Sequence, residues 1–532
     1  MKKNLTFIFD WYFSNGFLPN GLLPVTIGDA YLICVEKYWN QFDDDYKYQI
    51  DDFESDHLIK SILNIDKKRK FVNHPKVKNG ALFGFDWTKS SDNNNIFVPP
   101  SNRGDFNIKC LPVSELYRDL ESHHSTQLYI YPVEVLGGWA NLFTGNSKTF
   151  RNDDDNSNFT NEKENIFETM SKISFDMIQG NQMYMLISYL HEGRTHLDDY
   201  RILHENLDNF NINPEMIIFI SGDYNVHEHY NSWCDNKKIH KRIQTISSDH
   251  IYGESARNCA RHFSTKFDSK ITRFGYTSAI CKESDVNKIK SQIREKHFLS
   301  YNRSLNHGRP HRILFVTALE LKKLFDKGFV SAGAPVPIQL DFWEDNLYEN
   351  EVDDYTKTWS ELSVELPRYL DMTDFNTPGE WGFDLDYLPH YLGSYFSVVT
   401  ETAYYDTNLF PTEKIFKPIT NLHPFIVLGE PFMLKKLREL GYKTFSPFID
   451  ETYDEVVNHR DRFHLVVNEV ERLCNLKKEE LHEWYYSILK DVLIHNQEIL
   501  IERSRVNGRV EIFNKLYDLT WEKEKAPGEG LC

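Results

Sequence analysis

Two clusters of charged side chains in the C-terminal half could bind an anion, and the first is Thr412-Glu413-Lys414. Thr412 is a good N-cap, so a helix is predicted to begin behind it. A helix N-terminus offers free N–H groups to an anion. Lys414 would add a full positive charge for a phosphate, and the Glu413 carboxylate would accept hydrogen bonds from a ribose diol. The cluster therefore predicts a nucleotide-diphosphate site, and the alternative is a capped helix with solvated Glu and Lys side chains.

The second cluster is the segment 300–312, SYNRSLNHGRPHR, which contains three arginines and two histidines. A segment this basic inside an acidic chain indicates an anion site. Arg312 lies at a predicted helix start, where positive charge opposes the helix dipole, and a nearby phosphate would explain it. Asn302 and Arg303, at the end of the preceding apolar run, complete the candidate binding residues. The alternative is a basic surface loop.

Both clusters lie in stretches that resemble one enzyme family. The stretch SYFSVVTETAYYDTNLFPTEKIFKPITNLHPFIVLG resembles the donor-binding segment of the α1,3-fucosyltransferases, and FLSYNRSLNHGRPHRILFVTAL is similar to their upstream loop, whose arginine opens a helix. The order and spacing of both stretches agree with the family over roughly residues 297–450. The resemblance implies an inverting, metal-independent enzyme of the GT-B type, with no cofactor, that uses a nucleoside-diphosphate sugar, GDP-fucose in the family itself.

The resemblance also implies roles for individual side chains. Arg312 and Lys414 would hold the diphosphate, Glu413 the ribose, and Glu401 would approach the sugar or the phosphate next to it. The chain departs from the family where Thr402-Ala403 replaces Asn-Ser, and where Pro418 falls inside the predicted helix and should kink it. Both departures lie near the donor, so the sugar is left open.

Such a transferase needs a general base within hydrogen-bond reach of the acceptor hydroxyl. The base is expected from the other domain, and Glu192, directly after a predicted strand, is the first candidate. His191 is its rival and Asp223, after the next strand, is a third choice. The alternative for all three is an ordinary charged turn.

The elements that would position these residues form an α/β pattern. Continuous apolar runs predict buried parallel strands at 183–189, 216–220, 297–302, 395–400 and 425–428, and helices are predicted at 197–210, 312–325, 412–422, 432–440 and within 453–520. The alternation predicts two doubly wound Rossmann-like domains facing a cleft, with C-terminal helices. We expect residues 1–290 to form the acceptor side, with the first 150 or so irregular, and residues 291–532 to bind the nucleotide sugar, with the boundary near 285–297.

Composition excludes several other classes. The 532 residues carry 61 Lys and Arg against 79 Asp and Glu, a net charge of −18, which is unfavourable for a tight DNA binder. The seven cysteines contain no CxxC pair, which argues against a zinc knuckle or a disulfide scaffold. The apolar run at the N-terminus is interrupted by Asp10, and no stretch is long enough to span a membrane. The expected location is the cytoplasm of a bacterium or of a virus-infected cell.

Three rival interpretations remain open. Asp384 and Asp386 fit the DxD pattern of a metal-dependent GT-A transferase. His227 and His229, around Glu228, could lie on one face of a strand and bind a metal, although no third ligand is evident. The third rival is a non-catalytic carbohydrate-binding or virion structural protein on a degenerate transferase fold. The acceptor of a transferase would be a glycan, a protein or a modified base, and the oligomeric state is left open.

Overall fold

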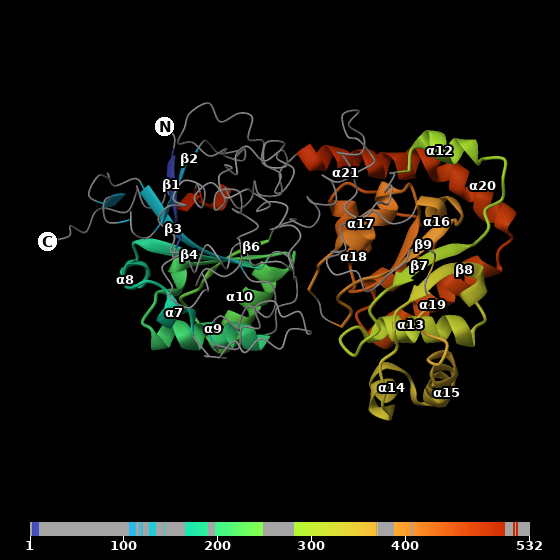
Figure 1. The fold of residues 1–532 in the computed structure, drawn as a ribbon, viewed down its shortest axis with the longest axis horizontal. Coiled ribbons are helices and arrows are strands. Elements are labelled where there is room, and N and C mark those ends of the chain that lie inside the picture. The colour runs from blue at the N-terminus through green and yellow to red at the C-terminus, as the bar shows by residue number, and fades with distance from the viewer. Residues whose placement is uncertain are drawn as a thin grey trace, which may run out of the picture. The chain divides into compact units, whose positions relative to one another are not determined.

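The computed structural model describes residues 3–9, 106–112, 116, 119–120, 127–134, 143, 165–189, 197–247, 281–368, 370, 388–405, 408–505, 514–516 and 518–519. The chain forms two compact units, residues 1–250 with 507–532 (unit 1) and residues 251–506 (unit 2). Figure 1 shows the elements of both units. The predicted assignment of acceptor binding to 1–290 and donor binding to 291–532 stays a prediction, because the units group residues by packing and not by ligand.

Unit 1 contains a six-stranded parallel sheet in the order β2-β1-β3-β4-β5-β6. Its strands are β1 (Lys3–Phe9), β2 (Phe106–Pro112), β3 (Gln127–Glu134), β4 (Met183–Tyr189), β5 (Ile217–Ser221) and β6 (Gln244–Ser247). The prediction that the first 150 residues are irregular is wrong, because β1, β2 and β3 lie there and β1 pairs with both of the others. The apolar run at the N-terminus is therefore a sheet strand.

The helices of unit 1 follow its strands in regular alternation. They are α7 (Ile166–Thr169), α8 (Lys172–Gln179), α9 (Leu197–Asn209), the 3₁₀ turn Pro214–Met216 and α10 (Val226–Lys237). From β3 to β6 each connection moves to the next strand in the same direction, so right-handed crossovers place α8, α9 and α10 on one face of the sheet. Buried Tyr200, Tyr230 and Trp233 pack together between α9 and α10.

Unit 2 contains a four-stranded parallel sheet in the order β10-β9-β7-β8. Its strands are β7 (Phe298–Asn302), β8 (Gly328–Ala332), β9 (Phe396–Thr400) and β10 (Phe425–Leu428). All five residues of β9 and all four of β10 are buried, which is why their sequences are continuous apolar runs. The predicted strands at 297–302, 395–400 and 425–428 are confirmed.

Helices flank this sheet and extend beyond it. They are α12 (Glu283–Lys288), α13 (Pro310–Leu321), α14 (Leu340–Asn346), α15 (Val352–Leu362), α16 (Leu388–Leu392), α17 (Glu413–Thr420), α18 (Met433–Glu439), α19 (His459–Asn475), α20 (Lys478–Ile488), the π-helical segment Leu489–Ile494 and α21 (His495–Arg505), with short 3₁₀ turns at Phe325–Lys327, Glu349–Glu351 and Thr452–Glu455. The helical C-terminal region is confirmed by α19, α20 and α21. Within the described residues, no helix combines the length and apolarity that crossing a bilayer requires.

The order of the strands makes unit 2 doubly wound. The chain runs from β7 through α13 to β8 on one side, and then from β9 through α17 to β10 on the other side of β7. Right-handed crossovers in opposite directions place α13 and α17 on opposite faces of the sheet. The predicted α/β class with Rossmann-like parallel sheets is confirmed in both units, and the cleft expected between them stays a prediction.

Candidate functional site

The strand order of unit 2 defines a switch point between β7 and β9. Loops that follow two such strands leave the sheet in opposite directions, and the crevice between them is the usual ligand site of open parallel sheets. Here these loops are residues 303–309, which lead into α13, and residues 401–412, which lead into α17. Both charged clusters singled out in the sequence therefore lie at the same edge of one sheet.

The start of α17 has the geometry expected of an N-cap. The Thr412 hydroxyl accepts a hydrogen bond from the Lys414 amide at 3.3 Å. The Lys414 ammonium bonds to the Glu413 carboxylate at 2.6 Å, the Thr402 hydroxyl at 3.1 Å and the Thr412 hydroxyl at 3.2 Å. The Lys414 side chain keeps 28% of its surface exposed, so its charge can reach a ligand.

Glu413 is largely buried next to this ammonium. Burial raises the pKa of its carboxyl, but Lys414, Lys417 and the hydrogen bond from Lys414 outweigh burial, and the net effect lowers the pKa. Glu413 is therefore an ionised acceptor at neutral pH. This state suits the predicted role of binding a ribose diol.

Glu401 points inward, toward the chain itself. It is fully buried, and its carboxylate accepts from the Thr412 amide at 3.2 Å, the Thr412 hydroxyl at 2.5 Å and the Thr402 amide at 3.1 Å. Burial raises the pKa of this carboxyl, against the opposing effects of Lys414 and of the Thr412 hydroxyl. A carboxylate held in this way braces the loop, whereas the family resemblance implied a contact with the sugar or its phosphate.

Arg312 and His311, in the first turn of α13, are also buried. The Arg312 guanidinium donates to the Thr400 carbonyl at 3.1 Å and to the Glu401 carbonyl at 3.4 Å, while His311 Nε2 donates to the same Glu401 carbonyl at 2.7 Å. Burial and the neighbouring Arg309 lower the pKa of Arg312 to about 10. Burial and Arg312 hold the pKa of His311 well below its usual value, so this imidazole is neutral. The two side chains fasten the end of β9 to the start of α13.

Asn302 and Arg303 lie in different environments. Asn302 is fully buried, and its amide bonds the Ser300 hydroxyl at 3.1 Å and the Thr400 hydroxyl at 2.9 Å, so it links β7 to β9. Arg303 is exposed directly after the carboxyl end of β7. A Cβ on Gly333 would lie 1.8 Å from the Arg303 carbonyl oxygen, so only glycine permits the loop after β8 to pass here.

A second arginine that the sequence analysis missed holds the other side of the loop 401–412. Arg462 on α19 is buried and donates to four backbone carbonyls, those of Gly429, Val456, Val457 and Tyr404. Its guanidinium also lies over the Tyr404 ring, 5.1 Å from the centroid. Sequence reasoning had no signal for this contact, because the arginine lies 58 residues after Tyr404, inside a long charged helix.

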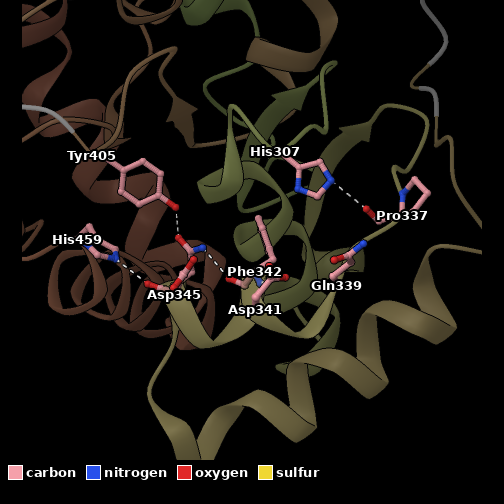
Figure 2. A pocket seen from close by; sticks show the side chains of 9 residues that line it. His307, Pro337, Gln339, Asp341, Phe342, Asp345, Tyr405 and His459 are labelled. Atoms are coloured by element: carbon pink, nitrogen blue, oxygen red, sulfur yellow. Dashed lines mark hydrogen bonds between the residues drawn. The ribbon is translucent and has the colours of Figure 1, made fainter. Parts of the chain in front are cut away.

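An open pocket of about 610 Å³ lies among the same loops (Figure 2), lined by His307, Pro337, Gln339, Asp341, Phe342, Asp345, Asn346, Tyr405 and His459. Figure 2 shows His307 and Tyr405 on opposite sides, with Phe342 and Asp341 between them. The rings of His307 and Phe342 are nearly perpendicular at a centroid distance of 6.0 Å, and the ring centroids of Tyr405 and His459 are 5.0 Å apart.

The polar groups of the pocket are partly fixed by one another. His307 Nε2 donates to the Pro337 carbonyl at 3.0 Å, the Tyr405 hydroxyl bonds the Asn346 side chain, and the Asn346 amide donates to the Phe342 carbonyl at 2.7 Å. The lining combines aromatic rings, two carboxylates and two amides, and contains no lysine or arginine. Such a lining suits a ring that carries hydrogen-bond donors. Among these lining residues, only His307 belonged to a charged cluster noted in the sequence. The others were missed because sequence alone does not distinguish an aromatic residue that lines a pocket from one in the core.

The remaining candidates fall in other places. His191, Glu192, Asp384 and Asp386 lie outside the described residues, so their predicted roles stay predictions. Asp223 is buried after β5, where it accepts from the Asn225 amide at 2.8 Å and bonds His229 Nδ1 at 3.2 Å.

The metal interpretation of residues 227–229 is wrong in its geometry. These residues lie in α10 and not in a strand, so the two imidazoles do not share a face, and His227 bonds Thr245 while His229 bonds Asp223. Among the described residues, no group of three or more His, Cys, Asp or Glu side chains is placed to hold a metal ion.

No family model and no curated protein matches this chain. Among solved structures, a UDP-forming α,α-trehalose-phosphate synthase from Burkholderia vietnamiensis aligns at 13% identity over 77% of this chain and 89% of its own, with a TM-score of 0.32. The N-terminal domain of Candida albicans trehalose-6-phosphate phosphatase aligns at 11% over 98% and 97%, with a TM-score of 0.39. The Burkholderia multivorans α,α-trehalose-6-phosphate synthase aligns at 11% over 95% and 98%, with a TM-score of 0.33. With identities of at most 13% and TM-scores of at most 0.39, these similarities do not identify an activity.

Proposed function

We propose that this protein is a glycosyltransferase that takes its sugar from a nucleoside-diphosphate donor bound at the carboxyl ends of β7 and β9. The observation that carries the proposal is the capped start of α17 at the switch point, where Lys414 stands partly exposed beside the Thr412 cap. Arg303 and Arg309 lie on the loop that follows the neighbouring strand β7. Positive charge at a helix N-terminus and an ionised Glu413 for the ribose are what a nucleoside diphosphate requires.

The roles of these groups follow from the charge on the leaving diphosphate. When the sugar departs, negative charge develops on the diphosphate, and fixed positive groups stabilise that charge in the transition state. Lys414 and the positive end of the α17 dipole would supply this stabilisation without a metal ion. Arg312 would act through the backbone, since its guanidinium is bonded to the carbonyls of Thr400 and Glu401.

The pocket next to these loops would receive a ring of the donor. His307 lies on the loop that carries Arg309, and Tyr405 lies on the loop that leads into α17 and Lys414, so we expect a ring joined to the bound diphosphate to reach the pocket. Aromatic walls favour a flat base or the apolar face of a sugar, and the carboxylates of Asp341 and Asp345 accept from N–H or hydroxyl groups.

The inverting reaction and a donor such as GDP-fucose rest on the family resemblance. The other finer assignments rest on the sequence pattern alone. They are an acceptor hydroxyl on a glycan, a protein or a modified base, Glu192 or His191 as the general base in the N-terminal half, and a cytoplasmic location.

The test is nucleotide binding by the full chain. GDP, UDP, ADP and CMP are titrated with and without EDTA while thermal stability is followed, because a ligand at 100 times its Kd adds about 2.7 kcal/mol. We expect one nucleoside diphosphate to stabilise the protein in EDTA, and Lys414→Ala to abolish the effect. Lys172→Ala is the matched control, because Lys172 lies in unit 1, is 85% exposed and pairs with Asp176 on the same helix.

Two results would redirect the assignment. Stabilisation only in the presence of a divalent ion would favour the metal-dependent transferase with Asp384 and Asp386. If no nucleotide binds at millimolar concentration, a non-catalytic carbohydrate-binding or virion structural role takes the place of the transferase. Hydrolysis of the donor sugar separates an enzyme from a protein that only binds nucleotide.

A further inference from the structure

Within the site, one hydroxyl connects a buried carboxylate to an exposed ammonium. Thr412 Oγ1 lies 2.5 Å from the Glu401 carboxylate, 3.3 Å from the Lys414 amide and 3.2 Å from the Lys414 ammonium. A hydroxyl has one proton to donate and two lone pairs with which to accept. Because the Lys414 amide and ammonium are both donors, the only acceptor among these three neighbours is Glu401.

This arrangement fixes the direction of every bond in the chain of contacts. The Thr412 proton goes to Glu401, which leaves the two lone pairs of the hydroxyl directed at Lys414. The Glu401 carboxylate also accepts from the Thr412 amide at 3.2 Å, so both the backbone and the side chain of the cap residue are held. A carboxylate, which only accepts, is the group that enforces this pattern.

Residue 401 is itself held from several sides. Its amide donates to the Leu428 carbonyl at 3.0 Å, and its own carbonyl accepts from His311. A Cβ on Gly429 would come within 2.9 Å of the Glu401 Cβ, so β10 closes tightly over the side chain. The carboxylate is fully buried, so it is far better suited to hold its neighbours in place than to contact a ligand.

We propose that Glu401 is a positioning residue that sets the place of the Lys414 ammonium through Thr412, and that it does not touch the donor. The expected effect on nucleotide affinity rests on the proposed function. The position of Lys414 can be measured without any nucleotide. The positioning role replaces the contact with the sugar or its phosphate that the family resemblance implied for Glu401.

The first experiment measures the reactivity of Lys414 in the full chain. Acetylation of Lys414 by acetic anhydride is followed by mass spectrometry in the wild type, Glu401→Gln and Thr412→Val. The amide NH₂ of Gln would donate where the carboxylate accepted, and the Thr412 hydroxyl would turn away from the ammonium, which would keep its bonds to Glu413 and Thr402 but lose the third. We expect the labelling rate to rise several-fold in both variants.

Asp454→Asn is the matched control for a loss of buried charge. Asp454 is a buried carboxylate of the same unit that accepts from the amides of Leu434 and Lys435 at the start of α18. We expect this variant to lose stability and to leave Lys414 labelling unchanged. An unchanged labelling rate in Glu401→Gln, or an equal rise in Asp454→Asn, overturns the inference.

The second experiment is a double-mutant cycle on the Kd of GDP and UDP, measured by calorimetry. Loss of a hydrogen bond to a charged group predicts about 10-fold weaker binding for Glu401→Gln and for Thr412→Val. The double variant should bind no more than about twofold more weakly than the weaker single variant, because both changes break one path. Thr412→Ser keeps the hydroxyl and should restore wild-type binding.

The outcomes distinguish the inference from the proposed function. Losses that multiply in the double variant would show that Glu401 contacts the ligand independently, and the positioning role would be rejected. A wild type that binds neither nucleotide refutes the proposed function, while the labelling result still decides whether Glu401 positions Lys414.

Discussion

The stability of unit 2 should depend on pH through one buried histidine. His423 follows α17 and is 1% exposed, and its ring bonds the Ser397 hydroxyl of β9 at 2.8 Å and the Ser394 carbonyl at 2.9 Å. Burial and the nearby Arg294 lower the pKa of His423 to about 3. The folded protein therefore keeps this imidazole neutral at every mildly acidic pH.

The unfolded chain behaves differently, because there the pKa of a histidine is about 6.5. Below that value the unfolded state binds a proton that the folded state excludes, so stability falls as the pH falls. Between pH 7 and pH 5 the difference amounts to about 1.5 pH units, or about 2 kcal/mol for His423 alone. Above pH 7 the contribution of this group is constant.

The assay compares the wild type with His423→Gln, which carries no titrating group. Hydrogen exchange at the amides of β9 and β10, corrected for the intrinsic rate at each pH, reports the unfolding free energy of unit 2. We expect the wild type to lose about 2 kcal/mol more than the variant between pH 7 and pH 5. The same loss in both proteins would refute the reasoning, because it would mean that His423 titrates alike in the folded and unfolded states.

Three further predictions test the loops around the site. Gly333→Ala places a Cβ against the backbone carbonyl of Arg303 and should destabilise unit 2 by about 3 kcal/mol or more in thermal unfolding, whereas Gly308→Ala, whose Cβ would meet only a side-chain atom at 3.4 Å, should stay within about 0.5 kcal/mol. Arg462→Lys leaves backbone carbonyls without donors and should cost about 2–4 kcal/mol by urea unfolding, and an unchanged midpoint would contradict the bracing role. Tyr405→Ala should weaken nucleotide-sugar binding about 10-fold in calorimetry while leaving pyrophosphate binding unchanged, and an equal loss for both ligands would rule out a pocket that binds the ring.

The strands of unit 2 could be predicted from sequence because they are buried on both faces. Their residues form continuous apolar runs that end in polar loops, and the charged clusters proposed to bind an anion lie in or just after the loops that follow β7 and β9. The N-terminal strands carried a weaker signal. β1 and β2 are polar at several positions and pair across a long intervening stretch, so local periodicity could not reveal the sheet.

Helix α10 shows a signal that was present but overridden. Val226, Tyr230 and Trp233 recur at helical spacing and are buried, yet the two histidines at alternate positions were interpreted as one face of a strand. The inward orientation of Glu401, in contrast, had no signal in the sequence. Its partners lie eleven residues later in the chain, and whether a carboxylate turns toward the protein or toward a ligand depends on packing that no local pattern encodes.

The pocket in Figure 2 has one property with consequences for evolution and engineering. Of its nine lining residues, six are exposed, namely His307, Pro337, Gln339, Asp341, Asp345 and Tyr405, whereas Glu401, Arg462 and His311 are buried. Substitutions at His307, Gln339 or Asp341 should therefore cost little folding free energy, and under the proposed function they would alter which ring the pocket binds. Libraries that vary these positions and keep Glu401 and Arg462 fixed would explore ligand preference on an unchanged scaffold.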